Sequence, residues 1–103
     1  MPSTQNSVKT VSSVKYVTGK YRVNANVLNV RAGPGTNYKI KSYKQLTSNA
    51  RYQNKKLGHK YTNGLKRGVV TTVTKVQNGF GLTPSGWISL SYCVIILVVR
   101  RNI

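Results

Sequence analysis

The chemistry open to this chain is limited first by the side chains that it lacks. None of its 103 residues is Asp or Glu, and it has one cysteine and one histidine, Cys93 and His59. Glycoside cleavage, catalytic triads in which an acid orients the histidine, and most catalytic metal sites use carboxylates. A Cys93–His59 dyad would lack an orienting acid, and we place His59 after a helix end and Cys93 beyond a closing strand. The sequence therefore predicts a protein that is not an enzyme and uses no metal and no cofactor.

The aromatic side chains favour binding instead. Seven Tyr and one Trp are more than we expect the core of one small domain to hold. A Tyr in a loop offers a rigid apolar face and a hydroxyl group that can bond a peptide or a sugar. Tyr38 follows a turn and is predicted to be such a residue. Trp87 lies in a predicted strand, where it could belong to the core or to a binding surface.

The net charge indicates anionic partners. Seventeen Lys and Arg without any acidic side chain give a formal charge of +17, whereas average proteins mix both signs. Such a charge attracts teichoic acids at a Gram-positive wall, or nucleic acid and anionic lipid elsewhere. A cationic surface with no dedicated partner is the other interpretation, and composition alone leaves both open.

Two stretches carry a more specific pattern. In residues 27–31 apolar and polar side chains alternate, which predicts a short half-buried strand with Val30 towards the core and Arg31 outwards. The Gly-Pro-Gly of residues 33–35 supplies the turn that follows, because Pro presets its own φ and glycine tolerates positive φ. Further along, residues 86–92 read Gly-Trp-Ile-Ser-Leu-Ser-Tyr, which predicts a strand followed by a Tyr in a short turn.

Together these stretches resemble the two signatures of bacterial SH3-like (SH3b) domains, the small β-barrels that anchor peptidoglycan hydrolases to cell walls. The resemblance covers roughly residues 20–93 and implies a mainly β fold, a small SH3-like barrel. It also implies a ligand-binding groove between the long first loop and the closing strand. The candidate ligand-binding residues are Arg31, Asn37, Tyr38, Trp87 and Tyr92.

One inserted α-helix is predicted within this pattern, from about residue 43 to 57. Ser42 and Gln45 have capping-box spacing, and Gly58 stands where a left-handed C-terminal cap is wanted. Apolar side chains between them fall at helical intervals on one face, namely Tyr43, Leu46, Ala50 and Leu57. The insertion is similar to a helical segment in SH3b domains of clostridial and phage lysins.

The remaining strands are predicted to follow the helix. Residues 69–76 form a β-branched run with strand propensity. Asn78-Gly79 favours a hairpin turn, because this pair adopts the turn that matches strand twist. Residues 80–82 then return, and residues 87–90 close the barrel.

Both ends are predicted to lie outside the SH3b-like part. Residues 1–19 are interpreted as a linker or N-terminal extension with an edge strand near residues 14–17, and no apolar secretory signal is visible. Residues 94–103 combine an apolar strand with a basic tail. The six aliphatic residues at 94–99 are too few to span a membrane, which takes about 20. They predict a terminal strand against the N-terminal one, or an exposed edge prone to self-association.

The leading hypothesis is a noncatalytic peptidoglycan-binding module that acts outside the cell and targets a hydrolase to the cell wall. A catalytic lysin domain would then be joined to it in cis, and teichoic acids would be a second wall partner. The alternative is a cationic β-barrel that binds polyanions, nucleic acid or teichoic acid. It would use phosphate contacts and base stacking on exposed Tyr.

Overall fold

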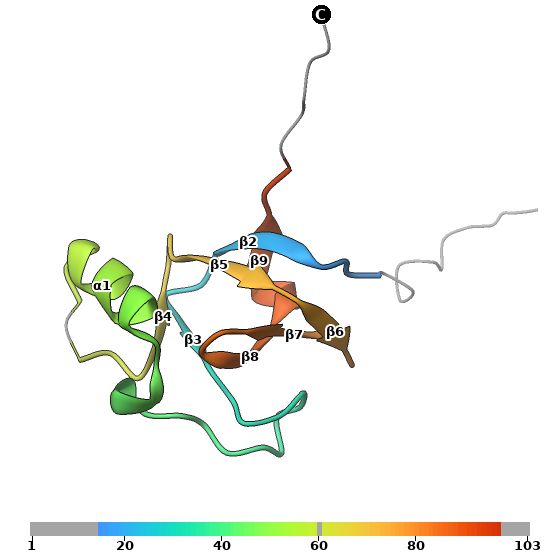
Figure 1. Cartoon of the computed structure of the whole chain (residues 1–103), viewed down its shortest axis with the longest axis horizontal. Helices are drawn as coiled ribbons and strands as arrows, with labels where there is room; N and C mark the ends of the chain where they lie inside the picture. Colours follow the sequence, from blue (N-terminus) through green and yellow to red (C-terminus); the bar gives the residue numbers. More distant parts are fainter. Residues whose placement is uncertain (1–14, 60, 98–103) are drawn as a thin grey trace, which may run out of the picture.

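The computed structural model describes residues 15–59 and 61–97 and builds them into short antiparallel strands with one short α-helix (Figure 1). The strands are β2 (Gly19–Val23), β3 (Val27–Asn29), β4 (Gly64–Lys66), β5 (Val70–Val73), β6 (Lys75–Gln77), β7 (Phe80–Thr83), β8 (Gly86–Ser89) and β9 (Cys93–Ile95). The helices are α1 (Ser48–Lys56) and two 3-10 turns, η2 (Tyr43–Gln45) and η3 (Leu90–Tyr92). The mainly β fold with one helix is confirmed.

The described strands form three antiparallel sheets, none of which closes into a barrel. Their strand orders are β5-β2-β9, β3-β4 and β6-β7-β8. The contacts that join the sheets include two through the backbone: Arg31 bridges to Trp87 of β8, and the N–H of Thr74 donates to the carbonyl of Leu82 at 3.0 Å. The sheets therefore surround a single apolar core, whose fully buried members include Val23, Val30, Leu65, Val69, Val73, Ile88 and Leu90.

The strand predicted around residues 27–31 is confirmed in place and in orientation. Leu28 and Val30 are buried, whereas Asn29 is exposed and Arg31 is half-buried. Regular pairing with β4 ends at Asn29, and Arg31 continues the strand by single bridges to Ile40 and Trp87. The alternation of the sequence thus places Asn29 and Arg31 on the outer face.

The predicted hairpin at Asn78-Gly79 is also confirmed. Both residues have positive φ, 54° and 77°, and Gln77 pairs with Phe80 across the turn. Positive φ at both central positions is what a tight hairpin turn requires, and Asn and Gly are the residues that adopt it most easily. The residues predicted as one run at 69–76 form two strands, β5 and β6, with Thr74 between them.

The helix predicted for residues 43–57 is shorter and begins later. Residues 43–45 form only the 3-10 turn η2, because the next residue, Leu46, is extended, with φ −77° and ψ 154°. Leu46 is buried in the core. Thr47 is the N-cap of α1, and its Oγ1 accepts a hydrogen bond from the N–H of Ala50 at 3.1 Å. Ser42 therefore begins η2, where its N–H donates to Gln45 Oε1 at 2.8 Å.

The C-terminal end of α1 is as predicted. Gly58 has φ 90°, its N–H donates to the carbonyl of Lys55, and the N–H of His59 donates to the carbonyl of Asn54. These two bonds form a Schellman-type cap, which favours glycine at the left-handed position. Leu57, which was predicted to lie on the buried face, is exposed.

Two side-chain amides of helix α1, those of Asn54 and Gln53, bond it to the sheets. Asn54 is 0% exposed, donates to the carbonyl of Gly64 at 2.8 Å and accepts from the N–H of Lys66 at 3.0 Å. Gln53 bonds both backbone groups of Val70, at 2.8 and 2.9 Å. Each amide forms hydrogen bonds with backbone N–H and carbonyl groups at a strand edge, which would otherwise need a neighbouring strand as partner.

Of the strand predicted for residues 94–99, only residues 94 and 95 lie in a strand, β9, while residues 96 and 97 do not and residues 98 and 99 lie outside the described residues. β9 pairs antiparallel with β2, with Tyr21 opposite Ile95 and Val23 opposite Cys93. The strand is half-buried rather than buried, because β9 is an edge strand and Val94 faces solvent. The strand expected near residues 14–17 is absent from the described residues 15–17, while residues 1–14 and 98–103 lie outside the described residues. No helix within the described ranges is long and apolar enough to cross a membrane.

Candidate functional site

The clearest hollow beside the predicted site residues lies on the outer face of β3, β7 and η3. It encloses about 570 Å³, and we call it the outer groove; its lining includes Asn29, Arg31, Thr36, Phe80, Ser89 and Tyr92. Two of the five predicted residues, Arg31 and Tyr92, therefore line one hollow. Arg31 comes from the strand part of the first stretch, before its Gly-Pro-Gly turn, and Tyr92 is the last residue of the second stretch.

Arg31 ties the long first loop to this groove. Its Nη1 donates to the carbonyls of Thr36 at 3.0 Å and Tyr38 at 2.9 Å. Its backbone is fixed independently, because its N–H and carbonyl pair with Trp87 at 2.8 and 2.9 Å. With no described carboxylate to neutralise it, the guanidinium keeps its positive charge at the groove wall.

Tyr92 supplies the opposite aromatic side. It ends η3 and its side chain is 56% exposed. Its carbonyl accepts from the N–H of Asn24 at 2.8 Å, which holds the backbone in place without using the ring. The ring and hydroxyl are therefore available to a ligand.

Phe80 is a groove residue that the sequence analysis missed. It pairs with Ser89 of β8 and is half-buried, and both side chains line the groove. The signal was present, because strand alternation after the Asn78-Gly79 turn puts Phe80 on the face opposite the buried Gly81.

Asn37 and Tyr38 lie on the first loop but do not line the groove. The Tyr38 ring rests on the turn, where a Cβ added to Gly33 would overlap it. Tyr38 is 44% exposed, and Asn37 is exposed beside it. The loop thus brings Thr36 to the groove while Asn37 and Tyr38 remain at its edge.

Trp87 belongs neither to the core nor to the groove lining. It is half-buried on the outer face of β8, opposite Leu82 of β7, while its neighbour Ile88 is fully buried inside. Through its backbone pairing with Arg31 it positions the groove wall. The sequence left Trp87 open between the core and a binding surface, and in the structure its side chain is in neither.

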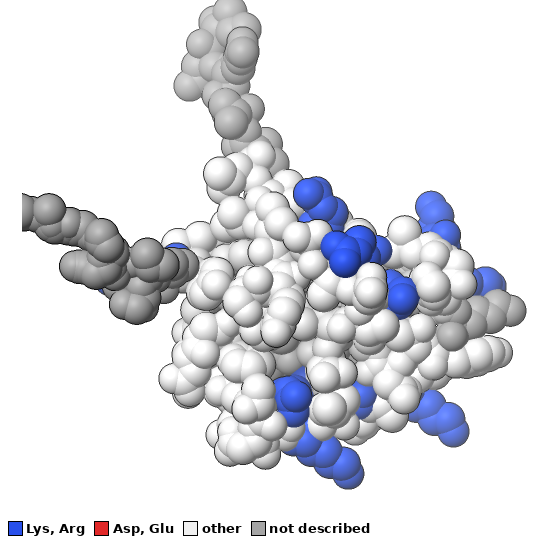
Figure 2. All heavy atoms as spheres, turned by 180° about the vertical axis from the view of Figure 1, so that it is seen from behind, with Lys and Arg blue, Asp and Glu red and all other residues white. Residues whose placement is uncertain are grey.

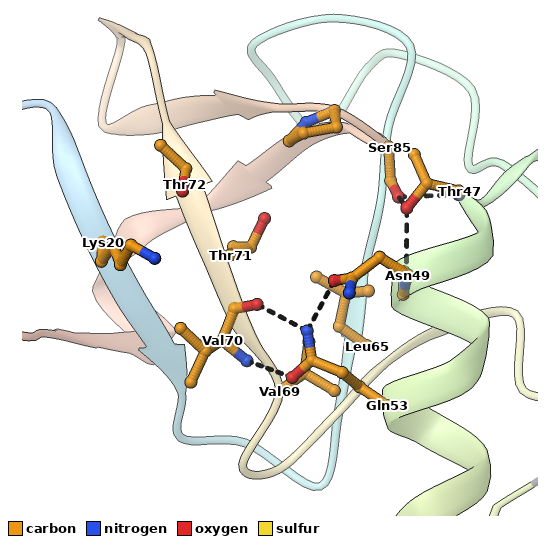
Figure 3. Close-up of a pocket in the computed structure, with 12 residues that line it drawn as sticks. Lys20, Thr47, Asn49, Gln53, Leu65, Val69, Val70, Thr71, Thr72 and Ser85 are labelled. Carbon is orange, nitrogen blue, oxygen red and sulfur yellow. Dashed lines mark hydrogen bonds between the residues drawn. The ribbon is translucent and has the colours of Figure 1, made fainter.

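A second hollow, the β5 pocket, lies between α1, β5 and the Pro84–Ser85 turn and encloses about 410 Å³ (Figure 3). Figure 3 shows the Gln53 amide bonded to Val70 and Ser85 bonded to Thr47 at its two sides. None of the predicted site residues lines it.

The open side of this pocket is a strand edge. The outward N–H of Val70 donates to Gln53 Oε1, and the N–H of Thr74 donates to the carbonyl of Leu82. Because alternate residues direct their backbone groups to the same side, Thr72 faces the pocket, where no described strand pairs with it. The β5 pocket can thus accept a short hydrogen-bonding backbone.

The two side chains considered for catalysis are not brought together. His59 is exposed after the end of α1, whereas Cys93 is half-buried in β9 and its Sγ donates to the carbonyl of Ser89 at 3.7 Å. Burial raises the pKa of the Cys93 thiol from 9.0 to about 11, so the nucleophilic thiolate is disfavoured at neutral pH. Among the described residues no cluster of three metal-ligating side chains occurs.

Lys and Arg side chains are spread widely over the face in Figure 2, and no acidic side chain interrupts them. An anion therefore meets attraction from several directions. Comparisons with known protein families, with curated proteins and with solved structures return no match to this chain.

Proposed function

We propose that this protein is a noncatalytic module that binds bacterial peptidoglycan and targets a hydrolase to the cell wall. The observation that carries the proposal is that Arg31 and Tyr92 both line the outer groove. Each of these residues belongs to one of the two stretches that resemble SH3b signatures. In this proposal the protein acts outside the cell, joined in cis to a catalytic lysin domain.

We also propose that the fold is an open variant of the SH3-like barrel. Its support is the pair of links between sheets, Arg31 to Trp87 and Thr74 to Leu82, which run where a closed barrel would have continuous strand pairing. In the open variant, the side chain of Gln53 replaces strand pairing at Val70.

The groove chemistry suits a peptide or sugar ligand. Phe80 and Tyr92 offer apolar ring faces, while Asn29, Ser89 and Arg31 offer hydrogen bonds around them. The other cations would hold anionic wall polymers such as teichoic acids by long-range attraction. Groove recognition and charge attraction make separable contributions.

The test is co-sedimentation with purified peptidoglycan stripped of teichoic acid. Tyr92→Ala should weaken binding about tenfold, equivalent to about 1.4 kcal/mol, because an aromatic ring at a ligand contact is removed. The matched control is Tyr52→Ala, since Tyr52 is similarly exposed, on α1, and does not line the groove. Equal binding by both variants, at unchanged melting temperature, would contradict the groove assignment.

The second candidate function is polyanion binding by charge, favoured by the +17 charge without any Asp or Glu. It predicts that stripping teichoic acid abolishes wall binding, and that DNA competes for the protein. Retention on stripped peptidoglycan in excess DNA would instead support the groove.

A further inference from the structure

A second group of aromatic side chains lies beside α1, away from the residues of the outer groove: Tyr43 of η2, Tyr52 of α1 and Tyr61 of the loop that follows α1. Tyr43, Arg51, Tyr52, Lys55 and Tyr61 surround a shallow hollow of about 280 Å³, and we call this group the aromatic platform. The Tyr43 and Tyr61 rings meet edge to face, with centroids 5.2 Å apart at 67°. The Arg51 guanidinium lies 5.5 Å from the centroid of Tyr43.

The platform occupies the face of α1 that the fold does not use. Ala50, Gln53 and Asn54 form the stripe that packs on and bonds the sheets. Ser48, Arg51, Tyr52 and Lys55 follow the same intervals of three and four on another face of the helix, and they line the hollow. The helix therefore carries one stripe for folding and another open to solvent.

Two of the platform rings remain available. Tyr52 is 58% exposed and Tyr61 is 71% exposed, although large aromatic side chains are usually well buried. Tyr61 is also held at φ 58°, a left-handed conformation that is unfavourable for a bulky residue. Its exposed ring is thus presented on a constrained backbone.

The platform combines charge and flat rings. Arg51 and Lys55 line it, and Lys56 follows with its Nζ 5.7 Å from the Tyr52 centroid, while the sequence offers no acidic side chain to pair with them. A polyanion without rings would use only the cations. An unpaired nucleotide strand uses both, because its bases stack on aromatic faces while its phosphates contact Lys and Arg.

We propose that the aromatic platform binds single-stranded nucleic acid, with bases stacked on Tyr52 and Tyr61 and phosphates held by Arg51 and Lys55. This site is independent of the peptidoglycan groove and does not rest on it. Base-paired duplexes would bind less well, since their bases are already stacked on one another.

The test compares two fluorescently labelled oligonucleotides of equal length and charge, one of thymidine and one abasic, by fluorescence anisotropy in physiological salt. The native protein should bind the thymidine strand about tenfold more tightly, because only that strand can stack. Tyr52→Ala and Tyr61→Ala should each remove most of this preference. Ile40→Ala is the matched control and should retain it, because Ile40 is an exposed apolar residue that lines neither the platform nor the outer groove.

Lys55→Gln separates the charge contribution from stacking. It should weaken the binding of both oligonucleotides by the same factor. The fall of log affinity with log salt concentration should become less steep, by about one in slope. Circular dichroism and melting temperature check that each variant folds, and Tyr52→Ala suffices alone if Tyr61→Ala does not fold. The proposal is overturned by equal affinity for both strands, or by a thymidine preference that survives Tyr52→Ala. It is also overturned if these variants lose only binding to anionic lipid vesicles.

Discussion

At the scale of single residues, Cys93 shows how burial changes the chemistry of a side chain. It lies in β9 opposite Val23 of β2 and packs against the core. Burial raises the pKa of its thiol from 9.0 to about 11, since the thiolate is poorly solvated there. In the unfolded chain the thiol returns to its ordinary pKa.

This difference predicts a loss of stability in alkali. A group whose pKa is raised by folding contributes stability that is complete below the unfolded pKa and is lost as the pH rises through the folded value. The contribution of Cys93 should therefore fall between pH 9 and about 11. Urea unfolding across this range should show a steeper decline for the native protein than for Cys93→Ala, which has no thiol to titrate. Parallel declines would contradict the buried position of the thiol.

Arg31 and Tyr38 each make a contact that holds the first loop. Both were predicted to contact ligand, and in the fold the Arg31 guanidinium also fastens the loop while the Tyr38 ring rests on Gly33. Their structural contacts explain why a loop with three residues of Gly and Pro can hold one shape beside the groove.

At the scale of elements, α1 depends on Asn54. Its amide joins the helix to both ends of β4, through Gly64 and Lys66, from a fully buried position. A buried polar group left without its partner costs about 1–3 kcal/mol. The attachment of α1 is thus a polar clamp surrounded by apolar core residues.

Asn54→Ala should lower the free energy of unfolding by about 2 kcal/mol or more, because it leaves one carbonyl and one N–H of β4 without partners. Chemical denaturation measures the loss. Asn37→Ala is the matched control, since Asn37 is exposed and its side chain forms no hydrogen bond to the described residues. A similar, small effect of both substitutions would show that water reaches Gly64 and Lys66.

At the scale of the whole molecule, the charge opposes folding. Seventeen cations without acidic side chains repel one another in the compact state, and no Asp or Glu is present to offset them. Mobile ions screen exposed charges over about 10 Å at 0.1 M. Electrostatics should therefore favour association with polyanions and weaken the isolated fold.

Added NaCl should raise the melting temperature, measured by circular dichroism, because screening reduces this repulsion. At constant ionic strength the melting temperature should change little between pH 3 and 5, since no side-chain carboxylate titrates there. An uncharged osmolyte at matched osmolality is the control for effects on solvation. A cooperative acid transition near pH 4, or a melting temperature that falls with NaCl, would contradict this account.

The sequence by itself determined the features that depend on neighbouring residues. Alternation put Val30 inside and Asn29 outside, with either Val27 or Leu28 as the other inward residue, Asn78-Gly79 made the hairpin turn, and Gly58 ended the helix. These features need only local backbone preferences and the spacing of apolar residues, which is two in strands and three to four in helices. Both can be seen in a short stretch of sequence. The resemblance to the SH3b signatures, rather than this local reasoning, made Arg31 and Tyr92 candidate ligand-binding residues.

Only the tertiary structure decided the features that depend on partners distant in the chain. The N-cap of α1 is Thr47 rather than Ser42, because Leu46 is buried in the core in an extended conformation. Asn54 is buried because β4 brings two unpaired backbone groups to it. Phe80 reaches the groove, and Trp87 stays beside it, because β8 lies between β7 and Arg31. A local pattern shows which face of an element is apolar, but packing against another element decides which groups that face meets.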